Sequence, residues 1–182
     1  IYLSIEAQPK SMLGQLVSGS LQIEGGRPVS IQLDPASLVE ISSQTTLDNF
    51  SYESCLVYAD QVLSLYEANG VNVNPAPQAR TFDLHLHSQG DLPFPNIEYR
   101  ITDATAPDAA GKFWAINYLY PGDVLKIKPF ETQGLDPLAQ KYGAGETHTL
   151  YTTVERLLQF QIGAEGISLV DSSPIQLKLV DD

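Results

Sequence analysis

Two pairs of oxygen-bearing side chains occur at the same spacing in the sequence. Glu53 and Glu67 are 14 residues apart, and so are Asp103 and Asn117. In an antiparallel hairpin, residues equidistant from the turn lie opposite each other. Each pair is therefore predicted to meet at the end of a hairpin away from its turn. If both hairpins belong to one array of sheets, the two pairs share one face of the molecule.

The chemistry predicted for this cluster is cation binding and hydrolysis. Ca²⁺ binds about six to eight oxygen atoms from carboxylates, amides and carbonyls. The predicted metal ligands are Glu53, Glu67, Asp103 and Asn117. A carboxylate beside a metal-polarised water is also the arrangement of a general base. Glu53 and Glu67 are therefore the predicted catalytic residues, with Ca²⁺ as the expected cofactor and no nucleotide or organic cofactor. The alternative is that all four are solvated loop residues in a chain with 22 Asp and Glu residues.

A loop rich in Asn and Pro follows the first pair. Residues 66–77 are not expected to form a central strand, because proline lacks the amide donor, and ordered surface loops often carry binding residues. Tyr66, Asn69 and Asn72 are predicted to bind a ligand. Arg100 is predicted to pair with a phosphate or carboxylate of that ligand. Turn chemistry alone also explains the loop, and Arg100 can equally bridge to a local acid.

The elements that position these residues are predicted to be strands. Apolar and polar residues alternate in several short segments, which is typical of strands with one buried face. The clearest of these segments are 18–23, 29–33, 81–87, 158–162 and 175–179. One short helix is predicted at 136–142, because Asp136 can cap its free amides and Pro137 suits its first turn. That helix lies within an insertion predicted at 124–149.

A repeat links the predicted strands. Residues 52–67 and 102–117 form two strand pairs of equal length at a shift of 50, and the pattern of 80–90 recurs in 156–166 at a shift of 76. Removing the 26 residues of the insertion returns this second shift to 50. A period of about 40 to 50 residues of β structure is typical of propeller blades. The predicted fold is an all-β propeller of four-stranded antiparallel blades, with residues 1–182 forming the whole domain or part of one, at about 3–4 blades.

Two segments of this repeat resemble a known family. Residues 52–70, which read YESCLVYADQVLSLYEANG, and residues 102–118 are similar to acid-led strand pairs of phytase-like, esterase-like β-propellers. The resemblance implies a multi-bladed, extracytoplasmic (periplasmic or secreted) propeller with hydrolase activity on an ester or phosphoester. It also implies that the four predicted metal ligands lie on inner strands near an axial channel. The chain departs from the family in two ways. It is too short for most full rings, so it is expected to be part of a larger propeller. It also lacks an Arg/Lys phosphate cluster, which argues against phytate as the substrate.

Composition narrows the expected partners. The 182 residues carry a net charge of −12, with a pI near 4.4, and show no basic footprint for a nucleic-acid duplex. No apolar run approaches the roughly 20 residues of a membrane-spanning helix. The expected partners are therefore an ester or phosphoester, or a protein that includes the remainder of a propeller, with no nucleic acid and no membrane span. The competing function is a non-catalytic binding or scaffold propeller that contacts a protein or glycan, and a β-sandwich lectin is the third interpretation.

Overall fold

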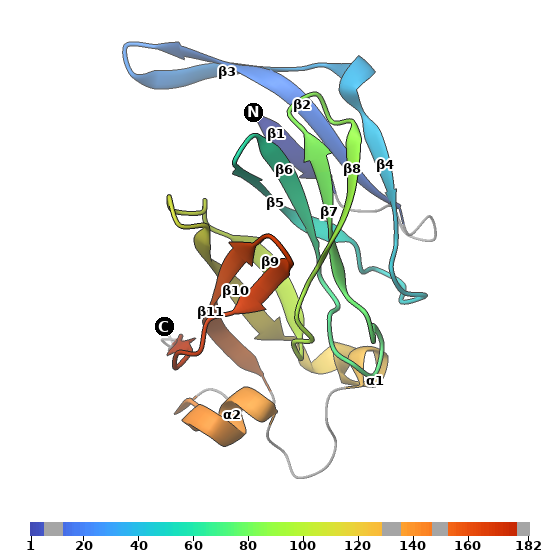
Figure 1. The fold of residues 1–182 in the computed structure, drawn as a ribbon, viewed down its shortest axis with the longest axis vertical. Helices are drawn as coiled ribbons and strands as arrows, with labels where there is room; N and C mark the ends of the chain where they lie inside the picture. Colours follow the sequence, from blue (N-terminus) through green and yellow to red (C-terminus); the bar gives the residue numbers. More distant parts are fainter. Residues whose placement is uncertain (6–12, 129–135, 147–152, 178–182) are drawn as a thin grey trace.

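The computed structural model of the protein describes residues 1–5, 13–128, 136–146 and 153–177 (Figure 1). Within these residues the chain forms three antiparallel sheets. The first sheet contains β1 (Tyr2–Ile5), β2 (Leu13–Glu24), β3 (Arg27–Leu33) and β4 (Val39–Ser42). The second contains β5 (Tyr52–Tyr58), β6 (Gln61–Tyr66), β7 (Gln78–Asp83) and β8 (Ser88–Pro93). The third contains β9 (Arg100–Ala104), β10 (Lys112–Leu119), β11 (Val154–Gly163), β12 (Gly166–Leu169) and β13 (Ile175–Gln176). The prediction of an all-β fold is confirmed, although the described residues form no closed ring of blades.

The second and third sheets share one strand order. Strands β5, β6, β7 and β8 are neighbours in chain order, and β9, β10, β11 and β12 follow the same order. Their first two strands coincide with the strand pairs predicted at 52–67 and 102–117. Their third strands carry the two segments that match at the larger shift, with Arg80 on β7 and Arg156 on β11. The repeat found in the sequence therefore corresponds to two sheets of equivalent topology.

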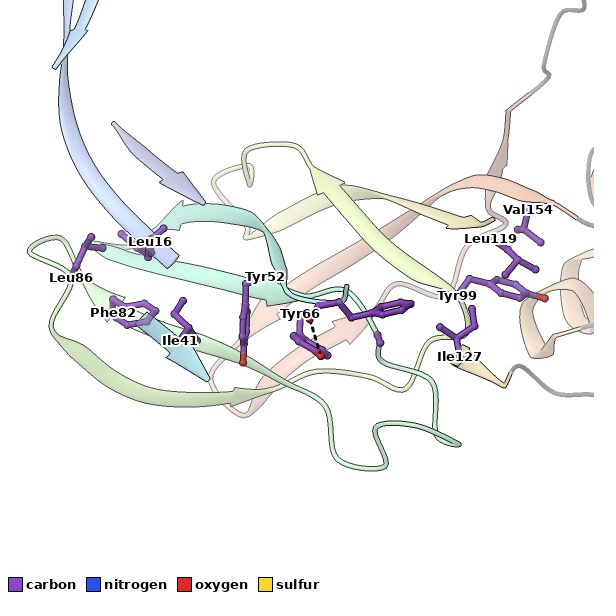
Figure 2. Packing of buried hydrophobic residues seen from close by; sticks show 13 residues of the cluster. Leu16, Ile41, Tyr52, Tyr66, Phe82, Leu86, Tyr99, Leu119, Ile127 and Val154 are labelled. Atoms are coloured by element: carbon purple, nitrogen blue, oxygen red, sulfur yellow. Dashed lines mark hydrogen bonds between the residues drawn. The ribbon is translucent and has the colours of Figure 1, made fainter. Parts of the chain in front are cut away.

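The second sheet is buried on both faces. On β6, Val62 and Tyr66 pack in one hydrophobic cluster, whereas Leu63 and Leu65 pack in the other. Figure 2 shows the first cluster, which extends from the first sheet past Tyr66 to the region of α1 (Val124–Ile127). Because side chains alternate along a strand, this sheet separates a core shared with the first sheet from a core shared with the third.

The same hydrogen bond joins the sheets at two places. The hydroxyl of Ser4 on β1 donates to the carbonyl of Tyr52 on β5, and the hydroxyl of Ser54 on β5 donates to the carbonyl of Thr102 on β9 at 2.5 Å. Both donor and acceptor advance by 50 residues from the first bond to the second. The first strands of successive sheets therefore lie side by side with a common geometry.

The helices are short. Those that lie within the described residues are the 3₁₀ turns η1 (Pro35–Ser37) and η2 (Pro121–Asp123) and the α-helices α1 and α2 (Pro137–Tyr142). The predicted cap of α2 is confirmed, because the Asp136 side chain accepts hydrogen bonds from the backbone N–H groups of Leu138 and Ala139. Of the predicted insertion, residues 129–135 and 147–149 lie outside the described residues.

Residues 18–33 of β2 and β3 form a two-stranded arm that extends away from the rest of the chain (Figure 1). Leu21 pairs with Ile31, so strand alternation places Leu21, Ile23, Ile31 and Leu33 on one face. These four side chains are between 37% and 58% exposed. The strands predicted here are confirmed, but the apolar face that the alternation predicted to be buried is open among the described residues.

Candidate functional site

Glu67 lies at the centre of a buried ion-pair network. Its Oε1 accepts a hydrogen bond from Arg100 Nη1 at 2.5 Å, and its Oε2 accepts one from the Ser51 backbone N–H at 2.8 Å. Arg100 Nε also donates to Asp123 Oδ2 at 2.9 Å. The guanidinium carbon of Arg100 lies 3.9 Å from the centroid of the Phe50 ring. The alternative that Arg100 bridges to local acids is confirmed.

Electrostatics holds this network in its charged form. Burial works against the charge of Arg100, but Glu67 and Asp123 outweigh it and raise the pKa of Arg100. The side chains of all three residues are at most 8% exposed. A general base needs a lone pair within reach of the proton that it removes. Each oxygen of Glu67 accepts a hydrogen bond and its side chain is fully buried, so in this structure the carboxylate holds Arg100. Its role as a general base stays a prediction.

A second network is centred on Arg156. Its Nε donates to Asn117 Oδ1 at 2.8 Å, and its Nη1 lies 3.0 Å and 3.1 Å from the two carboxylate oxygens of Asp136. Asn117 Nδ2 donates to the backbone carbonyls of Glu98 and Arg100, at 2.8 Å and 3.0 Å. This amide therefore connects the Arg156 network to the backbone of the Arg100 network.

The predicted pairing of Glu53 with Glu67 is wrong. Tyr52 pairs with Tyr66 and Ser54 pairs with Leu65, so Glu53 lies at an irregularity of the register. A bulge of this kind places two residues of one strand against one residue of its partner. Glu53 is partly buried at this bulge, and its charge contributes with burial to raising the pKa of Tyr118.

The predicted pairing of Asp103 with Asn117 is also wrong. Asn117 pairs with Ile101, and a register irregularity separates that pair from the pair of Ala115 with Ala104. Asp103 is exposed, and its Oδ1 accepts a hydrogen bond from the N–H of the following residue at 2.8 Å. In each hairpin the pairs on the turn side of the bulge, Ser54 with Leu65 and Ala104 with Ala115, already differ by one residue from the predicted pairing, and the bulge shifts the register further.

The side chains predicted to bind a ligand form hydrogen bonds within the protein. The Tyr66 hydroxyl lies 2.7 Å from Ser43 Oγ, and burial raises the pKa of Tyr66. Asn69 Nδ2 donates to the Tyr66 carbonyl at 2.5 Å, and Asn72 Nδ2 donates to the Lys128 carbonyl at 2.7 Å. Local turn chemistry therefore describes Asn69, whereas Tyr66 and Asn72 connect the loop to other segments. The role of these residues in binding stays a prediction.

The predicted calcium ligands do not fit a divalent cation in this arrangement. Glu67 is paired with Arg100, and Asn117 Oδ1 accepts from Arg156, so two of the four oxygen donors already face cationic side chains. Asp103 is exposed, so its carboxylate would offer its oxygens to a cation at the protein surface. Among the described residues, no group of three or more His, Cys, Asp or Glu side chains is placed to hold a metal ion.

A pocket of about 280 Å³ lies beside the Arg156 network. Its apolar walls are Val71, Ile97, Pro137, Leu138 and Leu169. Its polar side is formed by Asn96, Glu98, Asp136 and Arg156. Sequence reasoning assigned no role to Arg156 or Glu98 and used Asp136 only as a helix cap. The one signal was the match of Arg156 with Arg80 in the repeat, which predicted an equivalent position but not a site.

Comparisons with known proteins assign no family. No family model matches the chain, and no curated protein matches it. A crystal structure of a protein from Lactobacillus plantarum matches with a TM-score of 0.39 and 13% identity. The match covers 97% of this chain, which spans only 36% of that protein. At this TM-score the likeness carries no argument about fold or function.

None of the helices in the described parts of the chain has the length and apolar character needed to cross a membrane.

Proposed function

We propose that this chain is a non-catalytic scaffold module that binds protein through the apolar face of its arm. The observation that carries the proposal is the exposure of four aliphatic side chains on one face of residues 18–33. An isolated two-stranded hairpin is only marginally stable in water, and an exposed apolar patch on a soluble protein often marks an interaction site. A partner that covers the face would stabilise the arm.

The arm is suited to binding through its face rather than through its edge. Among the described strands β3 pairs only with β2, so β3 is an edge strand. Pro28 on β3 provides no N–H group, and proline on an edge strand disfavours pairing with a further strand. The apolar side chains of Ile31 and Leu33 are free of this restriction, because they project from the face.

The partner that we propose is a second copy of the same arm. Glu24 and Arg27 are the only charged residues of the arm, and their charges cancel within a chain of net charge −12. Two arms can therefore meet without the repulsion that the acidic bodies would cause. A two-fold axis between the arms would bring Arg27 at the tip of one arm towards Asp34 at the base of the other, as in other isologous contacts.

The arrangement of the sheets supports the proposal that they are propeller blades. The supporting observations are the shared order of the second and third sheets and the repeated hydrogen bond between their first strands. Blades of a propeller are four-stranded antiparallel sheets. The resemblance to phytase-like propellers and the metal-assisted hydrolysis that it implies stay predictions, and the engagement of Glu67 with Arg100 favours the scaffold class.

Analytical ultracentrifugation of the whole chain tests the proposed function. We expect the wild-type chain to form dimers at about 100 µM, and Ile31→Glu to be monomeric because it places a charge in the apolar contact. The matched control is Gln32→Glu, which adds the same charge on the opposite face of the same strand and should still dimerise. A monomeric wild-type chain, or equal loss of dimer in both variants, would contradict the proposal.

A further inference from the structure

We propose that the pocket beside Arg156 binds a small uncharged molecule that carries a hydrogen-bond acceptor on an apolar body. Amides and esters of branched or cyclic aliphatic groups belong to this class. The pocket contains no residue of the arm. This inference is therefore independent of the scaffold proposed above.

Arg156, one of the residues that line the pocket, carries a side-chain donor without a partner among the described residues. Arg156 is 1% exposed, its Nε donates to Asn117, and its Nη1 contacts Asp136. Its Nη2 is buried and has no hydrogen-bond partner among the described residues. A buried donor without a partner is unfavourable, so a ligand that offers an acceptor oxygen to Nη2 would gain a hydrogen bond at little desolvation cost.

The charges around the pocket favour an uncharged ligand. The carboxylate of Asp136 already balances the charge of Arg156, with contacts of 3.0 Å and 3.1 Å. Glu98 is a second acidic side chain in the lining and is buried. An anionic ligand would therefore meet two acidic groups, with Arg156 as the one cation among the residues that line the pocket. Arg156 therefore still lacks a hydrogen-bond acceptor for Nη2, but it does not lack a negative partner.

The rest of the pocket selects an apolar body of limited size. Its walls come from four parts of the chain, with Val71 in the loop after β6, Ile97 in the loop before β9, Leu138 on α2 and Leu169 on β12. The volume of about 280 Å³ is close to the lower limit of small-molecule pockets. A compact aliphatic group fits this space, and its burial supplies the hydrophobic part of the affinity.

The walls are held in place before any ligand binds. Asn96 Nδ2 donates to the carbonyls of Asn69 and Asn74, at 3.1 Å and 3.0 Å, which fixes the loop before β9 against the loop after β6. Asp136 fixes the start of α2 through its cap. A pocket that is already formed loses little conformational entropy on binding.

Three probes of similar shape test the inference by methyl-detected NMR titration of the whole chain. They are cyclohexanecarboxamide, cyclohexanecarboxylate and cyclohexylmethylamine, which are neutral, anionic and cationic. We expect the amide to shift the methyl signals of Val71, Leu138 and Leu169 with an affinity at least about 5-fold higher than that of the other two. Equal or tighter binding of the carboxylate, or no binding of the amide, would overturn the inference.

Two pocket variants and one control locate the binding. Leu138→Trp fills the pocket from α2, and Val71→Trp fills it from a position that is already 40% exposed and so tolerates substitution. Each should abolish amide binding in a chain that melts cooperatively. The control is Leu125→Trp, because Leu125 is 88% exposed on α1 and does not line the pocket. Unchanged amide binding in Val71→Trp would place the ligand elsewhere and overturn the inference.

Discussion

The second and third sheets carry an arginine at equivalent positions, but the two arginines differ in how far they are exposed. Arg80 on β7 forms an ion pair with Asp91 on β8 of its own sheet, with the two side chains 27% and 34% exposed. Arg156 on β11 forms an ion pair with Asp136, and both side chains are 1% exposed. Arg80 of the second sheet therefore lies near solvent, whereas Arg156 of the third sheet is enclosed by protein.

The difference arises from the chain between β10 and β11. In the second sheet a short loop connects β6 to β7, but in the third sheet the connection carries α1, α2 and the cap residue Asp136. This connection supplies both the carboxylate that neutralises Arg156 and the Leu138 wall of the pocket. The third sheet, with the longer connection, thus has a buried ion pair beside a pocket where the second sheet has a partly exposed one.

Removing the two acidic partners should give the largest difference between the sheets. We expect Asp136→Ala to destabilise the chain by about 3–5 kcal/mol, because it leaves a buried guanidinium without its counter-charge. Asp91→Ala should cost only about 0–1 kcal/mol, since the Arg80 pair is partly solvated. Urea unfolding followed by circular dichroism measures both values. Equal losses would show that the enclosure of Arg156 has no energetic consequence.

Glu67→Gln should have an intermediate effect. Arg100 keeps Asp123 in this variant, so we expect a loss of about 2 kcal/mol from one charged hydrogen bond. Glu53→Gln is the matched control at the neighbouring predicted catalytic position and should change stability by less than about 1 kcal/mol. The hydrolase prediction differs, because it expects turnover of p-nitrophenyl acetate to be lost in both variants without a difference in stability.

The strands could be predicted from the sequence, but the pairing of polar side chains could not. Alternation identifies a strand because side chains point to opposite faces, and the repeat identifies equivalent strands. Residues 84–87 were predicted as strand, but β7 ends at Asp83 and a turn follows. Glu53 and Asp103 were misplaced because the pairs nearest each turn already differ by one residue from the predicted pairing, and a bulge then shifts the register again. Alternation likewise identifies the apolar face of the arm, but it contains no information about what covers that face.

The burial of Arg156 depends on contacts distant in sequence. Asp136 and Asn117 come from a helix cap and from another strand, and neither is adjacent to Arg156 in the sequence. The match between Arg156 and Arg80 in the repeat suggested similar surroundings for the two. Only the position of α2 distinguishes them, and local patterning does not fix where a short helix packs.

Removing the hydrogen bonds between the first strands of the sheets should lower stability less, and by similar amounts at the two places. Ser54→Ala removes the donor to the Thr102 carbonyl, and we expect a loss of about 1 kcal/mol. Ser4→Ala should cost somewhat less, because Ser4 is only partly buried whereas Ser54 is buried, and the double variant should equal the sum. Ser20→Ala in the exposed arm is the control with no expected change. A double variant well above the sum would indicate that the two contacts between sheets are coupled.

The last comparison concerns the tyrosines beside the two arginines, Tyr99 beside Arg156 and Tyr52 beside Arg80. Their ionisation does not change stability at neutral pH. Burial and the charge of Asp136 raise the pKa of Tyr99, and Arg156 partly lowers it. Burial also raises the pKa of Tyr52, but the hydrogen bond from Gln44 and the charge of Arg80 partly lower it, and no carboxylate is among the main causes of the rise. In the unfolded chain each tyrosine loses its proton near pH 10, so above that pH the native state holds more protons than the unfolded state. Stability is therefore complete below pH 10 and falls as the pH rises towards the higher native values. We expect Tyr99→Phe to flatten the loss of stability between about pH 9 and 11 more than Tyr52→Phe does. Urea midpoints measured across this range provide the test, and an equal slope in both variants would mean that the enclosed carboxylate does not distinguish the third sheet from the second.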